Sequence, residues 1–156
     1  MAQFESLLSQ LDRDPHWTPE RCAAFELIQN FLSGPLVLLI RKKNEVLFPA
    51  LEGLFPLRDG PLAVLQEEHK ALRAHFGEVR RAGESLCRGE NEVGELRALS
   101  TSGRKGMELL NDHLYKEEKV LFPMVARYLT PERDEELLRR MESLGPLLAP
   151  HRGTDR

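Results

Sequence analysis

The chain has 156 residues, of which 41% are hydrophobic and 30% are charged, and its formal net charge at pH 7 is −3. This length supports one domain with a sizeable core, and the composition is typical of a soluble globular protein. A slightly acidic chain has no surplus of cations for nucleic acid or for an anionic membrane, so we expect neither partner.

The apolar runs, the N-terminal region and the cysteine spacing also limit the class of protein that we expect. The longest apolar run, residues 35–40, is shorter than the roughly 20 residues that cross a bilayer. The acidic N-terminal region, with Glu5, Asp12 and Asp14, does not resemble a signal peptide. Cys22 and Cys87 form no CxxC motif, so we expect free thiols in a cytoplasmic protein, with a bridge between them left open.

The first half of the chain predicts a short helix followed by a long one. Residues 4–11 place four apolar side chains at helical spacing. The long helix is expected to start after Thr18, a hydroxyl cap followed by proline, and to reach about residue 51. Gly34-Pro35 should kink or break it. Its predicted inner face includes one charged residue, Lys43, among apolar ones: Phe25, Ile28, Leu32, Leu36, Leu39, Val46 and Ala50.

The second half predicts two long helices and a short last one. The third helix should start at Pro61, with an inner face formed by Leu62, Leu65, His69, Leu72, Phe76, Val79 and Leu86. The fourth runs from about 92 to 129, and the last from the Thr130 cap to about 144. No segment alternates with period two, so we predict an all-α fold: an antiparallel four-helix bundle over residues 1–150, with short terminal helices and a frayed tail at 151–156.

His113 and Glu117 are the first candidate metal ligands. They lie four residues apart, on the face that also carries Gly106, Leu110, Val120 and Met124. An imidazole and a carboxylate so placed can bind one metal ion. A buried carboxylate is costly unless it is paired or metal-bound. The plainer alternative is that His113 only packs and Glu117 reaches solvent.

An internal repeat relates this stretch to the first half of the chain. The sequence Val-Leu-Phe-Pro occurs at 46–49 and again at 120–123, an offset of 74 residues. At that offset His113 corresponds to Leu39, and Glu117 corresponds to Lys43. One copy therefore carries two potential ligands, and the other carries an apolar residue and a cation.

Three motifs together resemble the hemerythrin-like family of HHE cation-binding domains. They are the duplicated Leu-Phe-Pro segments, the run from Gly60-Pro61-Leu62 to Glu67-Glu68-His69, and the stretch from His113 to Glu117. The resemblance implies a four-helix bundle around a non-heme di-iron site, in proteins that carry or sense oxygen, respond to nitric oxide, store iron or handle peroxide. It also implies that His69, His113 and Glu117 are metal ligands.

The first-half ligands of that family are missing here. The second-helix histidine is Leu39, the matching glutamate is Lys43, and residues 4–11 contain no histidine. We therefore predict a degenerate site without reversible dioxygen binding between two irons. Lys43 is expected to pair with Glu117, to replace one metal's charge and to keep that carboxylate ionised. Either one iron or zinc ion is held by His69, His113 and Glu117, or the cluster is metal-free.

Two other classes of function are an enzyme and a metal-free binding module. The chain contains no GxSxG, Walker or dinucleotide-binding motif, so an enzyme is the less favoured class, and the sequence names no small ligand. The competing function is a metal-free bundle that serves as a partner-binding module or a homodimer. The apolar residues in 53–57 could supply part of such an interface.

Overall fold

The computed structural model describes residues 1–52 and 60–146. All regular structure in these residues is helical, which confirms the all-α prediction for this part of the chain. The apolar stretch at 53–57 and the tail at 151–156 lie outside the described residues. The predicted domain boundary at residue 150 also lies outside them.

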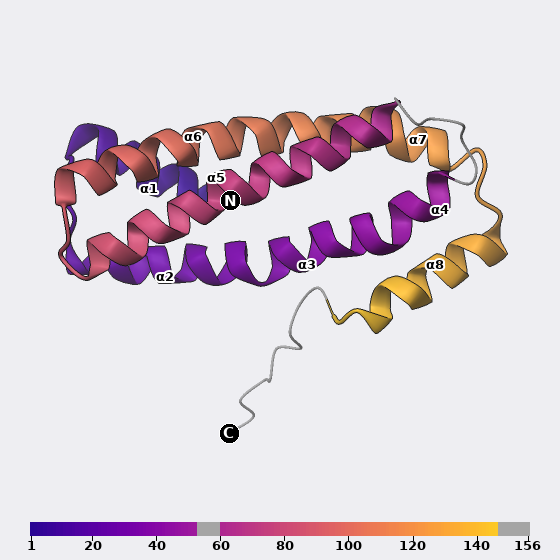
Figure 1. Ribbon diagram of the computed structural model, residues 1–156, viewed down its shortest axis with the longest axis horizontal. Coiled ribbons are helices and arrows are strands. Elements are labelled where there is room, and N and C mark those ends of the chain that lie inside the picture. The colour runs from indigo at the N-terminus through magenta and orange to yellow at the C-terminus, as the bar shows by residue number, and fades with distance from the viewer. Residues whose placement is uncertain (53–59, 147–156) are drawn as a thin grey trace, which may run out of the picture.

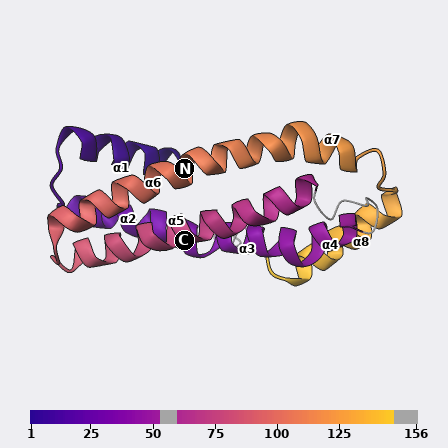
Figure 2. The same cartoon turned by 45° about the horizontal axis from the view of Figure 1, so that its top comes forward.

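The helical segments join into three long rods. These rods lie along the length of the molecule, with a short helix at each end (Figures 1 and 2). The short α1 flanks one end, and α8 lies beside the rod that contains α3 and α4 at the other. In chain order the elements are α1 (Ala2–Arg13), α2 (Pro19–Ser33), α3 (Pro35–Lys42), η1 (Lys43–Leu47), α4 (Phe48–Glu52), α5 (Pro61–Cys87), α6 (Glu92–Lys116), η2 (Glu117–Leu121), α7 (Phe122–Val125) and α8 (Pro131–Ser143).

The predicted helix starts and the predicted break are present. The Thr18 hydroxyl accepts a hydrogen bond from the backbone N–H of Arg21, and the Thr130 hydroxyl accepts one from Arg133. Each threonine precedes a proline at the first helical position. Gly34, at φ −107° and ψ −90°, separates α2 from α3. The break follows because Pro35 has no N–H to continue the helical hydrogen bonding.

The core consists of two apolar clusters. The larger one joins α1, α2, α3, α5 and α6, and in it Phe4 meets Phe76 edge-on with the ring centroids 6.4 Å apart. Gly103 permits this packing, because a Cβ there would lie 2.8 Å from the Phe4 ring. The smaller cluster is formed by Phe48, Leu51, Leu62, Leu65, Leu121 and Val125. Along each rod, the predicted site residues fall between the two clusters.

Two π-helical segments, η1 and η2, correct the predicted inner face. The N–H of Phe48 donates to the carbonyl of Lys43, five residues back, and the N–H of Phe122 donates to that of Glu117. Each π-turn inserts one extra residue and shifts the face that follows. Val120 is therefore 49% exposed, and Met124 is only half-buried. Leu121 and Val125 fill the core in their place.

The same shift appears in the first copy. Phe48 and Leu51 are fully buried, whereas the predicted Ala50 is half-buried. Before the π-turn, Leu39 is half-buried and its neighbour Ile40 lies in the core. The predicted stripe was thus correct at Lys43 and Val46 as well as up to Leu36, and it missed only at Leu39 and Ala50, each of which lies one residue before a buried one.

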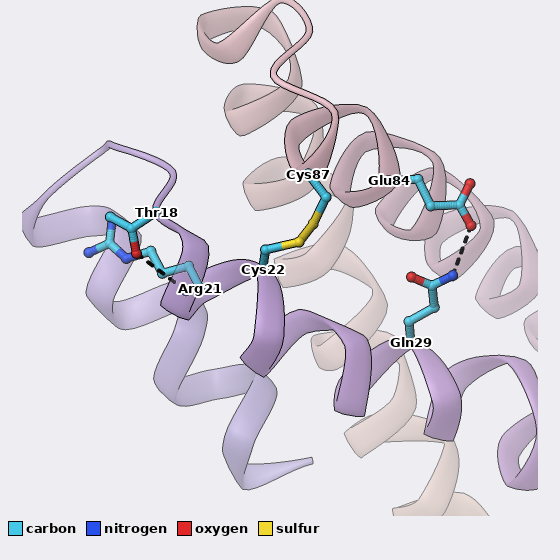
Figure 3. The surroundings of a disulfide bond; sticks show 6 residues. All are labelled: Thr18, Arg21, Cys22, Gln29, Glu84 and Cys87. Atoms are coloured by element: carbon cyan, nitrogen blue, oxygen red, sulfur yellow. Dashed lines mark hydrogen bonds between the residues drawn. A yellow bond between two sulfur atoms is a disulfide. The ribbon is translucent and has the colours of Figure 1, made fainter.

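The two cysteines form a disulfide, so the expectation of free thiols was wrong. Cys22 near the start of α2 bonds Cys87 at the end of α5, with their Cα atoms 5.6 Å apart (Figure 3). On the same seam Gln29 donates to Glu84 at 2.8 Å, so α2 and α5 run in opposite directions there. Spacing along the chain could not show this pairing. Disulfides persist mainly in oxidising compartments, so the cysteines no longer support a cytoplasmic location.

The rod from Pro19 to Glu52 also bears on the membrane argument. It has 34 residues and contains an 18-residue window with a mean hydropathy of 1.6, of which 28% is buried. By length and composition alone it could span a bilayer, so the argument from the run 35–40 does not hold for the whole rod. A core helix passes the same test, and Phe25, Ile28 and Leu32 of this rod lie in the larger cluster.

The disulfide makes a prediction for stability. Reducing it should lower the free energy of unfolding by about 2–4 kcal/mol, because it closes a loop across a separation of 65 residues. Urea denaturation of oxidised and reduced protein measures the difference. The Cys22→Ser/Cys87→Ser variant is the control and should not respond to reductant. Equal urea midpoints for the oxidised and reduced protein would contradict the prediction.

Two glycines of α5 should respond to alanine in opposite ways. A Cβ at Gly77 meets no atom within 4 Å, so Gly77→Ala should raise the free energy of unfolding by about 0.5–1 kcal/mol. A Cβ at Gly83 would lie 2.1 Å from the Phe25 ring, so Gly83→Ala should lower it. Urea denaturation of both variants is the test, and effects of the same sign would show that the packing around one of them is misassigned.

Candidate metal centre

The three rods bring the four predicted site residues together between the two apolar clusters. Lys43 begins η1, His69 lies in α5, His113 lies in the last turn of α6, and Glu117 begins η2. None of the four side chains is more than about a tenth exposed, and His69 is fully buried. The helical period that predicted inward positions for them was therefore correct up to the start of each π-turn.

The donor atoms of His69, His113 and Glu117 converge. The Nε2 atoms of the two histidines are 3.0 Å apart, and His113 Nε2 is 3.2 Å from Glu117 Oε1. One donor atom from each of the three residues lies within 4.8 Å of the others. Two nitrogens that each bind a common ion at about 2.1 Å can stand 3.0 Å apart. The three residues can therefore present their donors to one cation.

Hydrogen bonds on the far side of each ring set the histidine tautomers. His69 Nδ1 lies 2.7 Å from the amide oxygen of Asn44, and His113 Nδ1 lies 2.9 Å from the Glu68 carboxylate. Both partners are acceptors, so each ring donates through Nδ1–H and keeps a lone pair on Nε2. Phe48 further fixes His69, because the two rings stack 4° from parallel with their centroids 5.4 Å apart.

One oxygen of the cluster has no hydrogen-bond partner. Glu117 Oε1 is buried and unpaired among the described residues, and it faces the two Nε2 lone pairs. Three acceptors without a proton between them repel one another, and a buried carboxylate oxygen left unsatisfied is costly. A cation at this point would satisfy all three donors. The residues present therefore fit a metal ion.

The predicted ion pair between Lys43 and Glu117 is present. Lys43 Nζ lies 2.5 Å from Glu117 Oε2, and the two side chains are 8% and 2% exposed. At a separation of roughly 4 Å and an effective dielectric of 20, such a pair gains about 4 kcal/mol of Coulomb energy, which desolvation offsets in large part. Burial raises the pKa of Glu117, but His113 and Lys43 outweigh it and hold that pKa below its usual value.

The pKa shifts of His69 and Glu68 favour a neutral imidazole and an ionised carboxylate. Burial, aided by the neighbouring His113 and Lys43, lowers the pKa of His69 to about 4. Its ring is therefore neutral near pH 7, which is the form that binds metals. Burial raises the pKa of Glu68, but its contacts with Lys116 and His113 lower it overall, so this carboxylate is ionised.

Asn44 and Glu68 are the site residues that sequence reasoning missed. Glu68 was named only as part of the motif Glu67-Glu68-His69, and no sequence pattern pointed to Asn44. Both stand next to an inward-pointing residue, and neighbours on a helix point about 100° apart. The sequence signal is therefore only their position beside an inward-pointing residue, because their partners lie on another rod.

Comparison with known proteins gives a family and distant relatives. The model of the hemerythrin HHE cation-binding domain matches residues 1–125, and again residues 60–144. The iron-sulfur cluster repair proteins YtfE of Yersinia pestis (strain Pestoides F) and Yersinia pseudotuberculosis (serotype O:1b, strain IP 31758) are each 28% identical over 87 residues. That alignment covers 55% of this chain and 39% of each relative. No solved structure matches.

The buried ion pair makes a prediction. In metal-free buffer, Lys43→Met should lower the free energy of unfolding by about 3–5 kcal/mol, because it leaves the buried Glu117 carboxylate without a counter-charge. Lys43→Met/Glu117→Gln, which removes both charges, should recover much of this loss. Urea denaturation measures both.

The surface pair Lys70–Glu67 provides the matched control. Its side chains are 69% and 71% exposed, so Lys70→Met should have little measurable effect. The account of the pair fails if Lys43→Met unfolds at the same urea concentration as Lys70→Met.

Proposed function

The chain belongs to the hemerythrin HHE cation-binding domain family, and from that premise we propose that it binds a single divalent metal ion, iron or zinc, through His69, His113 and Glu117. The observation that carries the proposal is the unpaired Glu117 Oε1 beside two converging histidine nitrogens. Two imidazoles and one carboxylate form a ligand set known for non-heme iron and for zinc.

Lys43 argues for one metal rather than two. Its ammonium contacts the second carboxylate oxygen of Glu117, and its positive charge would repel a further cation at that oxygen. The repeat equivalent of His113 is Leu39, which has no donor atom. Helix α1 contains no histidine, and it packs in the larger apolar cluster. The ligands of a second metal are therefore missing from the positions that the family uses.

The overall arrangement that we propose is an antiparallel four-helix bundle with a half-length first helix. The packing of α1 on α2 and α6 supports this arrangement. The 12 residues of α1 cannot run the length of α6, which has 25. The end of the bundle that holds the metal centre would then lack its first-helix wall.

The chain's own residues would orient the bound ion. Asn44 and Glu68 hold the two rings with Nε2 directed inward, and Lys43 keeps Glu117 ionised. With three protein ligands, a bound iron would supply open coordination positions for a small ligand. We propose a metal centre for this chain, and we do not extend the activity of the whole repair proteins to it, because the alignment covers only 39% of their length.

Charge balance favours a second candidate, a metal-free bundle that binds a partner protein or a second copy of itself. Lys43 neutralises Glu117, and Lys116 neutralises Glu68. The two lysines therefore balance the two carboxylates, and these four side chains carry no net charge without a metal. A divalent ion would add two positive charges, so a metal-free polar cluster is electrostatically self-consistent.

Elemental analysis separates the two candidates. Protein loaded with Fe²⁺ under anaerobic conditions and then desalted should retain one metal ion per chain, and His113→Ala should lose it. His16→Ala is the control, because the His16 side chain is 74% exposed, and this variant should retain the ion. Absence of metal from the loaded wild-type protein would favour the metal-free candidate. Two ions per chain would contradict the role given to Lys43.

A further inference from the structure

A concave pocket with a volume of about 360 Å³ opens between the rod of α2 and α3 and helix α5. It is lined by ten residues, none of which is acidic, and its apolar wall is formed by Leu32, Leu36, Ile40, Leu72 and Phe76. We propose that this pocket binds a free medium-chain fatty carboxylate. The apolar wall would take its chain, and Arg73 and Arg80 would take its head. This inference goes beyond the metal centre and does not depend on it.

The size and the walls of the pocket suit a small amphiphile. Ligand sites commonly enclose about 300–1,000 Å³ and are mostly apolar, with a few placed polar groups. This pocket lies at the small end of that range. A flexible alkyl chain can follow such a wall and gains free energy in proportion to the apolar area that it removes from water.

The rim of the pocket selects for an anion. Arg73, Gly77 and Arg80 lie at helical positions i, i+4 and i+7, so they follow one face of α5. Arg73 makes no ion pair within the part of the chain that the structure describes. Arg80 has only an exposed carboxylate, Glu84, at 3.7 Å. A guanidinium binds a carboxylate through two parallel hydrogen bonds, so two available arginines match an anionic head.

Gly77 keeps the space between these arginines open. Glycine inside a helix is unfavourable compared with alanine. Close packing offers no reason for glycine here, because a Cβ at Gly77 would meet no described atom within 4 Å. No strained backbone angle requires glycine at this position either. A side chain there would instead project into the pocket that Gly77 lines, between the two cationic positions.

Isothermal titration of the full chain with decanoate tests the proposal. We expect one decanoate per chain and at least a tenfold loss of affinity in Arg73→Gln/Arg80→Gln. The matched control Arg97→Gln/Arg139→Gln removes the same charge elsewhere and should bind as the wild type does. Decyltrimethylammonium, which has the same chain length and the opposite charge, should not bind.

A second variant tests the pocket rather than the charge. Gly77→Leu should fill the space and abolish decanoate binding, with circular dichroism reporting the fold. If this variant does not fold, the arginine variant decides alone. The proposal is overturned if the wild type does not bind decanoate, if the arginine variant binds with unchanged affinity, or if the cationic amphiphile binds equally well. It is also overturned if light scattering shows a dimer that Gly77→Leu dissociates, which would assign the pocket to a second copy.

Discussion

The buried pair of Lys43 and Glu117 is the interaction on which the arrangement of the centre depends. An ammonium and a carboxylate 2.5 Å apart, almost without exposure, lie where three long rods meet. Neither charge would be tolerated there alone, because an unpaired charge in an apolar interior costs several kcal/mol. Together they allow the polar cluster to persist between two apolar clusters, and they leave one oxygen of Glu117 facing the histidines.

The pair also shows how the two halves of the chain have diverged. Lys43 and Glu117 occupy equivalent positions of the repeat, and each begins a π-helical segment whose first carbonyl accepts from a phenylalanine N–H. Both copies thus share the π-helical backbone, while the side chains at its first position, Lys43 and Glu117, carry opposite charges. Because the charges at the two equivalent positions are opposite, the two side chains neutralise each other.

Sequence reasoning succeeded where helical period alone decides the geometry. It placed His69, His113 and Glu117 inward, and it identified Lys43 as the partner of Glu117. It failed at Val120, because a π-turn changes the period and nothing in the local composition announces it. It failed at Cys22 and Cys87, because their pairing depends on how α2 and α5 align. Asn44 and Glu68 were missed because their roles exist only through contacts with another rod.

The central claim is that Lys43 has replaced a second metal, leaving one site at His69, His113 and Glu117. Anomalous scattering at the iron edge from crystals of iron-loaded protein tests it most directly. The account predicts one anomalous peak, close to the two Nε2 atoms and Glu117 Oε1, with the Lys43 ammonium still on the other carboxylate oxygen. Two peaks, or a Lys43 side chain displaced from Glu117 by metal, would contradict it.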